Sequence, residues 1–434
     1  MSETPLKVVY LDRCTPKQRE QLLKRSELDA ASVLLRVCKV VADVREQGDA
    51  ALVEYTERFD GVKLKAEQIR VSKEEIHAAY KLVSGDVVDA IKQAAQAITK
   101  FQEEQMSKEW IKEFQPGVKA GQLVRPLERV GTYVPGGLAR YPSSVLMTVI
   151  PARVAGVKEI VLCTPPQREG KVDPATLVAA DVAGASAVFK VGGAQAIAAM
   201  AYGTATVPKV DKIVGPGNVY VVAAKQVVSP DVGIDFAAGP SEVLVIADGS
   251  ADPKFIAADL VAQAEHDPSA AAVLVTTSEK LASRVCELVG EELRDNPRKD
   301  IASKSLASYG RVLVARDLEE AIDFANEYAP EHVELMVERP EQALKQIKNA
   351  GAVFLGPYSP VAAGDFAVGP NHVLPTGGVA KWKSGLSVLD FLRLPTVQSL
   401  TEGGLKHVAS VTEKMAEAEG LPGHARSIRA RLRR

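Results

Sequence analysis

The stretch DLVAQAEHDPSAAAVLVTT gathers several metal-binding or proton-carrying side chains at the end of one predicted helix. Gln263, Glu265, His266 and Asp267 follow an apolar helical pattern that stops at a proline, and a strand is predicted over 271–276. Gln263 and His266 are three residues apart and therefore share one helix face, from which they can hold a metal ion on one side. A polar, solvated helix end explains the same residues.

Two further histidines lie beside carboxylates. Glu331 and His332 follow a proline that ends the preceding helix, so a carboxylate and an imidazole begin one new element. Neighbours in a regular strand point to opposite faces, so both can serve one site only if that first turn is irregular. Asp365 and His372 lie in a loop rich in glycine, whose backbone can approach a ligand closely.

The last polar group lies near the C-terminus. Glu419 and His424 flank a Gly-Leu-Pro-Gly break, which taken alone is equally compatible with an exposed turn. The remaining histidines, His77 and His407, lie in plain helical patterns and are interpreted as structural or solvent-facing.

Alternating strand and helix patterns surround these residues. Helical periodicity dominates from residue 26 to about residue 112. From about residue 129, short strands alternate with helices and glycines occupy the strand-to-helix turns; a second such series runs over 242–356. A loop-rich segment, 357–387, and a mostly helical tail follow. This alternation predicts an α/β fold with parallel strands joined by crossover helices, in which ligands bind beyond the carboxyl ends of strands.

Length and composition narrow the classes of protein. The 434 residues exceed what one compact core needs, so two or more domains are expected. A net charge of −2 favours neither nucleic acid nor an anionic membrane as a partner. No apolar stretch reaches the ~20 residues of a membrane span, and the N-terminus lacks a secretion signal. The four cysteines show no CxxC spacing, which indicates reduced thiols and a cytoplasmic location.

A glycine fingerprint for a dinucleotide is incomplete. The stretch VGPGNVYV supplies Gly215 and Gly217, but Val219 and Tyr220 stand where a third glycine is needed. The residues alone therefore leave open a zinc hydrolase in which Glu331 activates water. A non-catalytic binding protein with an α/β cleft is also open.

Eight motifs taken together resemble the histidinol dehydrogenase family, in the family's order, from about Val130 to Leu386. They are YVPGG, YPSSVLM, GGAQAIAAMAYGT, KIVGPGNVYV, AAGPSEVLVIAD, QAEHDP, YAPEHVEL and AGDFAVGPNHVLPT. The tail is similar to the family more loosely. The resemblance implies a cytoplasmic, zinc-dependent homodimer with shared active sites. It implies oxidation of L-histidinol through L-histidinaldehyde to L-histidine in two NAD-dependent steps, the last of histidine biosynthesis.

The resemblance also implies a role for individual residues. It assigns one zinc ion per subunit to Gln263, His266, Asp365 and His424, with His424 coming from the partner subunit. Manganese and cobalt suit the same nitrogen and oxygen ligands. Proton transfer is assigned to Glu331 and His332. The implied substrate-binding residues are Ser241, Gln263, His266, His332, Asp365, His372, Glu419 and His424, and the implied nucleotide-binding residues are Tyr133, Gln195 and Asn218.

For the architecture, the resemblance implies two incomplete Rossmann-like α/β domains, a helical N-terminal region and a helical C-terminal tail that swaps in a dimer. We expect an N-terminal arm over 1–25. A first α/β domain, with most metal and catalytic residues, is expected over 26–132 plus 243–386. A nucleotide-binding domain is expected over 133–242. The tail, 387–434, is expected to contribute to the partner's active site.

One residue departs from the family's pattern. Val361 stands four residues before Asp365, where family members often carry Glu. Loss of a carboxylate there leaves open a related NAD- and zinc-dependent dehydrogenase of another small polar alcohol. The presence of Ser241, Glu419 and His424 favours histidinol.

Overall fold

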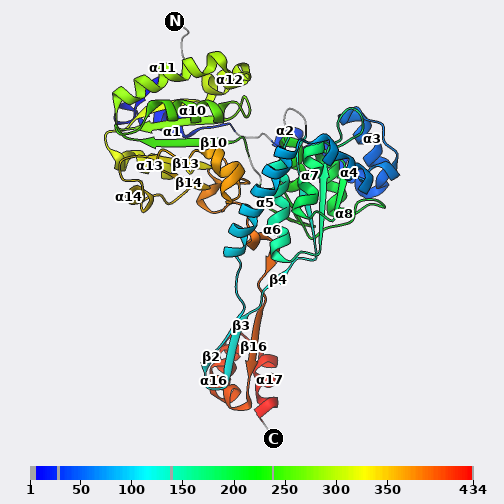
Figure 1. The fold of residues 1–434 in the computed structure, drawn as a ribbon. Coiled ribbons are helices and arrows are strands. Elements are labelled where there is room, and N and C mark those ends of the chain that lie inside the picture. Colours follow the sequence, from blue (N-terminus) through cyan, green and yellow to red (C-terminus); the bar gives the residue numbers. More distant parts are fainter. Residues whose placement is uncertain (1–5, 27–29, 137–139, 237–238, 433–434) are drawn as a thin grey trace.

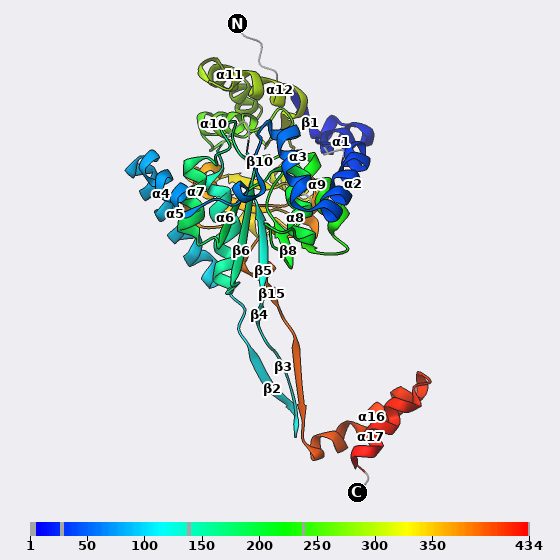
Figure 2. The same ribbon diagram turned by 90° about the vertical axis from the view of Figure 1, so that its right-hand side faces the viewer.

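The computed structural model describes residues 6–26, 30–136, 140–236 and 239–432. Two α/β units form the body, and an extension leaves it and carries the C-terminal helices (Figures 1 and 2). Each unit is built on a parallel sheet, which confirms the predicted fold class of two incomplete Rossmann-like units. No helix of the described ranges is long and apolar enough to cross a membrane.

The first unit contains a five-stranded parallel sheet in the order β7-β6-β5-β8-β9. Its strands are β5 (Arg129–Tyr133), β6 (Glu159–Thr164), β7 (Ala187–Lys190), β8 (Lys212–Val214) and β9 (Gly233–Ile234). The connecting helices are α6 (Pro142–Ala155), α7 (Pro174–Ala183), α8 (Gly193–Tyr202) and α9 (Val219–Val228). The strand order reverses between β5 and β8, which is where open α/β sheets bind ligands beyond the carboxyl ends of their strands.

The N-terminal helices pack on this five-stranded unit. They are α2 (Ala30–Gln47), α3 (Asp49–Asp60), α4 (Lys73–Leu82) and α5 (Gly85–Glu104). Val37 and Val44 of α2 share a core with α8 and α9, whereas Ile91 and Ile98 of α5 share a core with α6 and α7. The prediction that residues 26–132 belong with 243–386 is therefore wrong: the apolar faces of these helices are buried against the other unit, and β5 is its central strand.

The second unit contains a six-stranded parallel sheet in the order β1-β12-β11-β10-β13-β14. Its strands are β1 (Val8–Tyr10), β10 (Glu242–Ala247), β11 (Ala271–Thr276), β12 (Arg311–Val314), β13 (His332–Met336) and β14 (Ala352–Leu355). Its helices are α1 (Pro16–Leu23), α10 (Pro253–Ala264), α11 (Glu279–Asp295), α12 (Lys299–Tyr309), α13 (Leu318–Tyr328) and α14 (Pro340–Leu344). The predicted N-terminal arm thus supplies an edge strand, β1, which pairs with β12.

Alternation along β13 decides which side chains face which helices. Val333 and Leu335 belong to the core on the α13 side of the sheet, and Met336 belongs to the core on the α10 side. Because successive side chains of a strand point to opposite faces, His332 and Glu334 lie on the α10 side with Met336.

The extension is a three-stranded antiparallel ribbon followed by two helices (Figure 1). The ribbon joins β2 (Trp110–Gln115), β3 (Val118–Gln122) and β16 (Thr396–Leu400), and a second short pair joins β4 (Arg125–Pro126) to β15 (Leu392–Arg393). Helices α16 (Glu402–Ala418) and α17 (Pro422–Leu432) end the chain. The tail is mostly helical, as predicted, but two strands follow its first short helix, η5 (Val388–Phe391). The loop-rich segment before it contains α15 (Val361–Ala363) and the helical turn η3 (Gly364–Val368).

Candidate active site

The candidate active site lies at the amino-terminal edge of the six-stranded sheet, where β10 and β13 begin. The Nδ1 atom of His332 donates to the carbonyl oxygen of Glu242 over 2.9 Å. The carboxylate of Glu331 accepts a hydrogen bond from the backbone N–H of Glu242 over 2.8 Å. The preceding turn is irregular, with Ala329 at a φ of 50°. Glu331 and His332 therefore meet, with 3.5 Å between Oε2 and Nδ1.

Burial and charge shift the pKa values of this pair. Burial raises the pKa of Glu331 to about 8, against the opposing charge of His332. Burial alone would lower the pKa of His332, but the carboxylates of Glu331 and Asp365 raise it to about 9. A carboxylate with a raised pKa is a stronger base once it has lost its proton, so Glu331 has the property that a general base needs.

Asp365 approaches His332 from the turn η3. Its Oδ1 lies 3.7 Å from the Nε2 atom of His332, and its side chain is 14% exposed. The imidazole of His372 donates from Nδ1 to the backbone carbonyl of Asp365 over 2.9 Å. Burial tends to raise the pKa of Asp365, but His332, His372 and His266 together hold it below its usual range. Three imidazole rings therefore interact with one carboxylate.

The end of α10 brings Gln263 and His266 to the same place. Gln263 is buried, and its amide nitrogen has no hydrogen-bond partner among the described residues. His266 lies at the rim of the site, and its side chain is exposed. Partial desolvation by the surrounding protein lowers the pKa of His266, and the charge of Asp365 opposes that shift. Within the described residues, no group of three or more His, Cys, Asp or Glu side chains is arranged to hold a metal ion. One chain contributes only His266 and Asp365 of that kind to the predicted ligand set, beside the Gln263 amide.

The tail residues are not part of this cluster in one chain. Glu419 ends α16 and His424 lies in α17, and both are exposed. Figures 1 and 2 show these helices at the far end of the extension, away from both sheets. The geometry of a single chain therefore brings together Gln263, His266 and Asp365, without His424.

His372 links the two units. The hydroxyl of Ser144, near the start of α6, lies 3.4 Å from the Nε2 atom of His372. Because Nδ1 of His372 donates to a carbonyl, Nε2 is left as the acceptor for Ser144. The side-chain amide of Asn371 donates to the carbonyl oxygen of Met147 over 2.7 Å. Sequence reasoning missed Ser144, which lies inside the YPSSVLM motif but shows no spacing to another polar residue.

Glu242 is a second residue that sequence reasoning missed. It follows the half-buried Ser241, and its carboxylate pairs with Arg25 over 2.7 Å and accepts from the backbone N–H of Gly377 and Glu331. Burial raises its pKa although Arg25 opposes the shift. The only signal in the sequence is a charged residue at the start of an apolar strand, and this charge holds the loops around the site.

The three predicted nucleotide-binding residues lie at the carboxyl edge of the five-stranded sheet. Tyr133 ends β5, and its hydroxyl accepts from the backbone N–H of Gly193 over 3.1 Å. Asn218 follows β8 and caps α9 with its side-chain oxygen. Gln195 follows β7 and is buried, and its Oε1 atom has no hydrogen-bond partner in the part of the chain that the structure describes. These positions flank the strand-order reversal between β5 and β8.

A buried ion pair shapes the glycine turn after β8. Lys225 donates to Asp235 over 2.6 Å and to the carbonyl oxygen of Gly215. The other oxygen of Asp235 accepts from the backbone N–H of Gly215 over 2.8 Å. Gly215 has a φ of 117°, and a Cβ there would lie 2.1 Å from the carbonyl oxygen of Tyr133. This turn therefore requires glycine.

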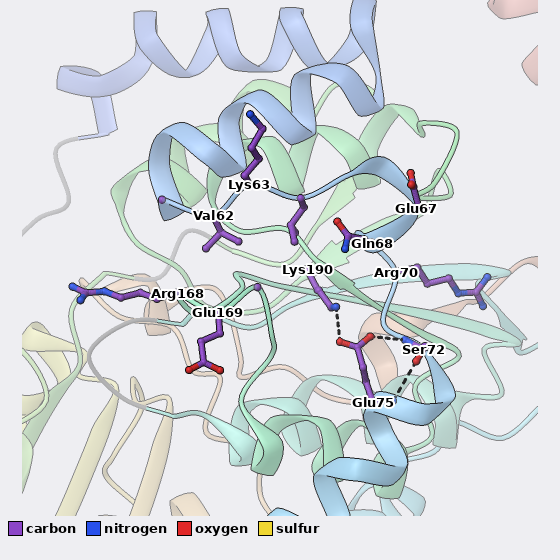
Figure 3. A pocket seen from close by; sticks show the side chains of 13 residues that line it. Val62, Lys63, Glu67, Gln68, Arg70, Ser72, Glu75, Arg168, Glu169 and Lys190 are labelled. Atoms are coloured by element: carbon purple, nitrogen blue, oxygen red, sulfur yellow. Dashed lines mark hydrogen bonds and ion pairs between the residues drawn. The ribbon is translucent and has the colours of Figure 1, made fainter.

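A separate pocket of about 580 Å³ lies beside β7 and the segment before α4 (Figure 3). Its charged lining residues are Lys63, Glu67, Arg70, Glu75, Arg168, Glu169 and Lys190. Lys190 is buried and pairs with Glu75, which also accepts from the backbone N–H of Ser72. None of the predicted site residues lines this pocket, so the convergence at β13 identifies the candidate site instead.

Comparisons with known proteins agree on one family. A family model described as histidinol dehydrogenase matches residues 23–432. The chain is 54% identical to the histidinol dehydrogenase of Methanothermobacter thermautotrophicus, over 95% of this chain and 96% of that one. It is 49% identical to the enzyme of that name from Methanocaldococcus jannaschii, over 99% and 100%. The crystal structure of histidinol dehydrogenase from Elizabethkingia anophelis superimposes with a TM-score of 0.94 at 43% identity, covering 98% of this chain and 97% of that one.

Proposed function

The chain belongs to the histidinol dehydrogenase family, and we propose that it oxidises L-histidinol to L-histidine through L-histidinaldehyde, with NAD as the hydride acceptor in both steps. The observation that carries the proposal is the convergence of His332, Glu331 and Asp365. The loop beside them is hydrogen-bonded, through His372 and Ser144, to the unit that contains the five-stranded sheet. Family membership makes the chain an oxidoreductase and removes the hydrolase and the binding protein as alternatives.

His332 is suited to take the proton of the substrate hydroxyl. Its Nδ1 atom is occupied by the carbonyl oxygen of Glu242, so this hydrogen bond keeps the proton on Nδ1 in the neutral ring. Its Nε2 atom is buried and has no hydrogen-bond partner within the described ranges. Nε2 is therefore the nitrogen that takes a hydroxyl proton as hydride leaves the carbinol carbon, once the ring has lost the second proton that its raised pKa of about 9 favours.

Glu331 is suited to the second step. The aldehyde must gain water before a second hydride can leave, and a base must take a proton from that water. Glu331 is 5% exposed and lies 3.5 Å from His332, so it can act at the same carbon from a shielded position. Burial strengthens it as a base by raising its pKa.

We also propose one zinc ion per subunit, held by Gln263, His266, Asp365 and His424 of the partner subunit. The unpartnered amide of Gln263, the rim position of His266 and the carboxylate of Asp365 support this set. When bound, zinc supplies an anchor for the imidazole and amine of the substrate, which fixes the carbinol against the nicotinamide. The nitrogen and oxygen ligands also accept manganese or cobalt.

The extension supports a homodimer with shared active sites. All six residues of β2 are exposed, including Trp110, Ile111 and Phe114. Val411 and Met415 of α16 are exposed as well. An apolar surface of this kind on a protruding ribbon is typical of a protein–protein interface, and covering it with a second copy would bring the tail helices onto a neighbouring body. We propose that Glu419 and His424 reach the partner's site in this way.

The cytoplasm is the proposed location. All four cysteines, Cys14, Cys38, Cys163 and Cys286, are free thiols, and such thiols persist in a reducing compartment.

The test is the amount of NADH formed per L-histidinol, with and without a chelator. We expect two NADH per substrate and loss of activity after metal removal. Val361 favours one rival, a dehydrogenase of another small polar alcohol, because a carboxylate is missing from that side chain. No NADH from L-histidinol in protein shown to contain zinc would support the rival.

A further inference from the structure

Two carboxyl groups lie one layer beneath the candidate active site. Glu334 of β13 is 1% exposed and faces α10. Asp259 of α10 lies within hydrogen-bonding reach of its carboxyl group. The Oε1 atom of Glu334 accepts from the backbone N–H of Val361, the first residue of α15, over 3.0 Å. One side chain therefore contacts all three elements that carry the site.

The spacing places each contact under a site residue. Residues four apart in a helix share a face, as do residues two apart in a strand. The stacked pairs are Asp259 with Gln263, Glu334 with His332, and Val361 with Asp365. The contacts of Glu334 thus lie about one helical turn, or one strand repeat, below the cluster.

The second oxygen of Glu334 requires a proton. Oε2 is fully enclosed and has no N–H or O–H partner in the described part of the chain. The carboxyl of Asp259 interacts with that of Glu334, and two ionised carboxylates in a buried contact repel each other. A proton between them converts the contact into a hydrogen bond. In agreement, burial raises the pKa of Glu334 to about 8 and that of Asp259 to about 6.

We propose that Glu334 is a positioning residue whose carboxyl, sharing one proton with Asp259, ties β13, α10 and α15 together and so sets the spacing of the site above. This inference rests on the proposed function of His332, Gln263 and Asp365. The inference also bears on Val361. The Val361 side chain carries no carboxylate, but the carboxyl group of Glu334, on strand β13, contacts the backbone N–H of Val361.

Two substitutions test whether Glu334 acts as a protonated acid or as a negatively charged carboxylate. In Glu334→Gln, the amide oxygen can accept from Val361 and the amide nitrogen can donate to Asp259, so the variant mimics the protonated acid permanently. Glu334→Leu keeps the bulk and removes both contacts. Met336→Leu, on the same face of β13, is the matched control for repacking.

The first readout is zinc affinity, measured by competition with a chromogenic chelator. We expect Glu334→Gln and Met336→Leu to bind zinc within about twofold of the unaltered protein. Glu334→Leu should bind zinc about 10–100-fold more weakly, as when other residues that orient metal ligands are removed. If Glu334→Leu does not fold, Asp259→Leu, which removes the same shared contact, replaces it.

The second readout needs neither metal nor substrate. The folded protein holds the proton of Glu334 more tightly than the unfolded chain does. The stability that results is therefore full below about pH 4.5 and is lost as the pH rises through about 8. Among the described residues, the charged groups that interact with Glu334 are Asp259 from α10 and His332 from β13, and α15 contributes the backbone N–H of Val361. The thermal unfolding midpoint of the metal-free protein should therefore fall less steeply between pH 5 and pH 9 in Glu334→Gln than in the unaltered protein.

Three results would overturn the inference. Equal pH slopes in the unaltered protein and Glu334→Gln would eliminate the shared proton. Full zinc affinity in Glu334→Leu would eliminate the positioning role. A raised KM for L-histidinol in Glu334→Gln, with unchanged zinc affinity, would show direct contact with the substrate amine. Failure of the proposed function would appear differently, as absence of L-histidinol oxidation by the unaltered protein.

Discussion

Replacing Asp235 with Asn tests whether a buried ion pair shapes the nucleotide edge of the five-stranded sheet. The side chains of Lys225 and Asp235 are 3% and 1% exposed, and both hold the backbone of Gly215. Asparagine keeps an oxygen for the N–H of Gly215 but removes the charge opposite Lys225. The amide nitrogen then faces Lys225 and cannot accept, so the buried lysine keeps only the carbonyl oxygen of Gly215 from its present acceptors.

The expected loss of stability follows from that geometry. Removing one partner of a buried ion pair costs about 3–5 kcal/mol, because the other charge stays uncompensated. Asparagine preserves one hydrogen bond, so we expect the lower end, about 3 kcal/mol. At about 2–4 °C per kcal/mol, the unfolding midpoint should fall by roughly 6–12 °C. The affinity for NAD should fall about 10–100-fold, since a charged hydrogen bond that fixes the turn is worth about 1.5–3 kcal/mol.

The assays are thermal unfolding and calorimetric titration with NAD. Arg284→Ala, which breaks an exposed pair with Glu287, is the control and should change neither measurement. The double variant Lys225→Met, Asp235→Leu should recover most of the midpoint but not the affinity, because apolar replacement of a buried pair is often neutral. An unchanged midpoint in Asp235→Asn would refute the energetic reasoning. A lowered midpoint with unchanged affinity would remove Gly215 from the nucleotide site.

Four further outcomes are expected. His266→Asn and Asp365→Ala should each deplete bound zinc, because each removes one of four protein ligands; metal analysis of the purified variants checks this. Glu331→Gln should spare histidinaldehyde formation more than its onward oxidation, as measured by NADH released from each substrate. Mixed dimers of Asp365→Ala and His424→Ala subunits should regain one intact site, and no recovery in verified heterodimers would place the tail ligand in its own chain. Burial raises the pKa of Asp60 to about 6, so its stabilising effect is full below about pH 4 and is lost through pH 6. Asp60→Asn should therefore exceed the unaltered protein in stability at pH 7 by about 1–2 kcal/mol after allowing for partial exposure, and urea unfolding at pH 4 and pH 7 measures this.

Local patterns predicted the α/β elements but not all of their partners. Apolar runs bounded by glycine turns indicated the strands and helices of both parallel sheets, because central strands such as β10 and β11 are buried on both faces and crossover helices such as α11 bury one face. The amphipathic pattern of α2 and α5 shows that one face is buried, but it carries no information about which unit covers that face. The ribbon was missed for a different reason. Every side chain of β2 is exposed, so the strand shows no apolar alternation to detect.

The residues of the candidate site were likewise predicted only in part. The helix-ending proline and the glycine-rich loop indicated Glu331, His332 and Asp365 as unusual residues, and the resemblance implied their shared purpose. Glu242 and Glu334 escaped notice because each is a single charge within an apolar strand. What makes such a charge acceptable is a set of partners far away in the sequence, such as Arg25 for Glu242 and Asp259 for Glu334. Those partners become visible only in three dimensions.

Opposite edges of the two sheets meet at the site, and their polarity suits the two proposed ligands. Ser144, near the start of α6, faces the carboxyl edge of β5, whereas its partner His372 lies at the amino edge of β13. Helix N-termini at a carboxyl edge present free N–H groups and partial positive charge, which favour the phosphates of a dinucleotide. Because α10 runs antiparallel to its strands, its C-terminus with Gln263 lies at the amino edge, where partial negative charge favours a cation. If the metal ion were bound at a carboxyl edge, the nearest helix ends would be N-termini, whose partial positive charge repels a cation. Open α/β sheets usually bind ligands beyond the carboxyl ends of their strands. The second unit departs from this rule, and the cation that we propose it binds explains the departure.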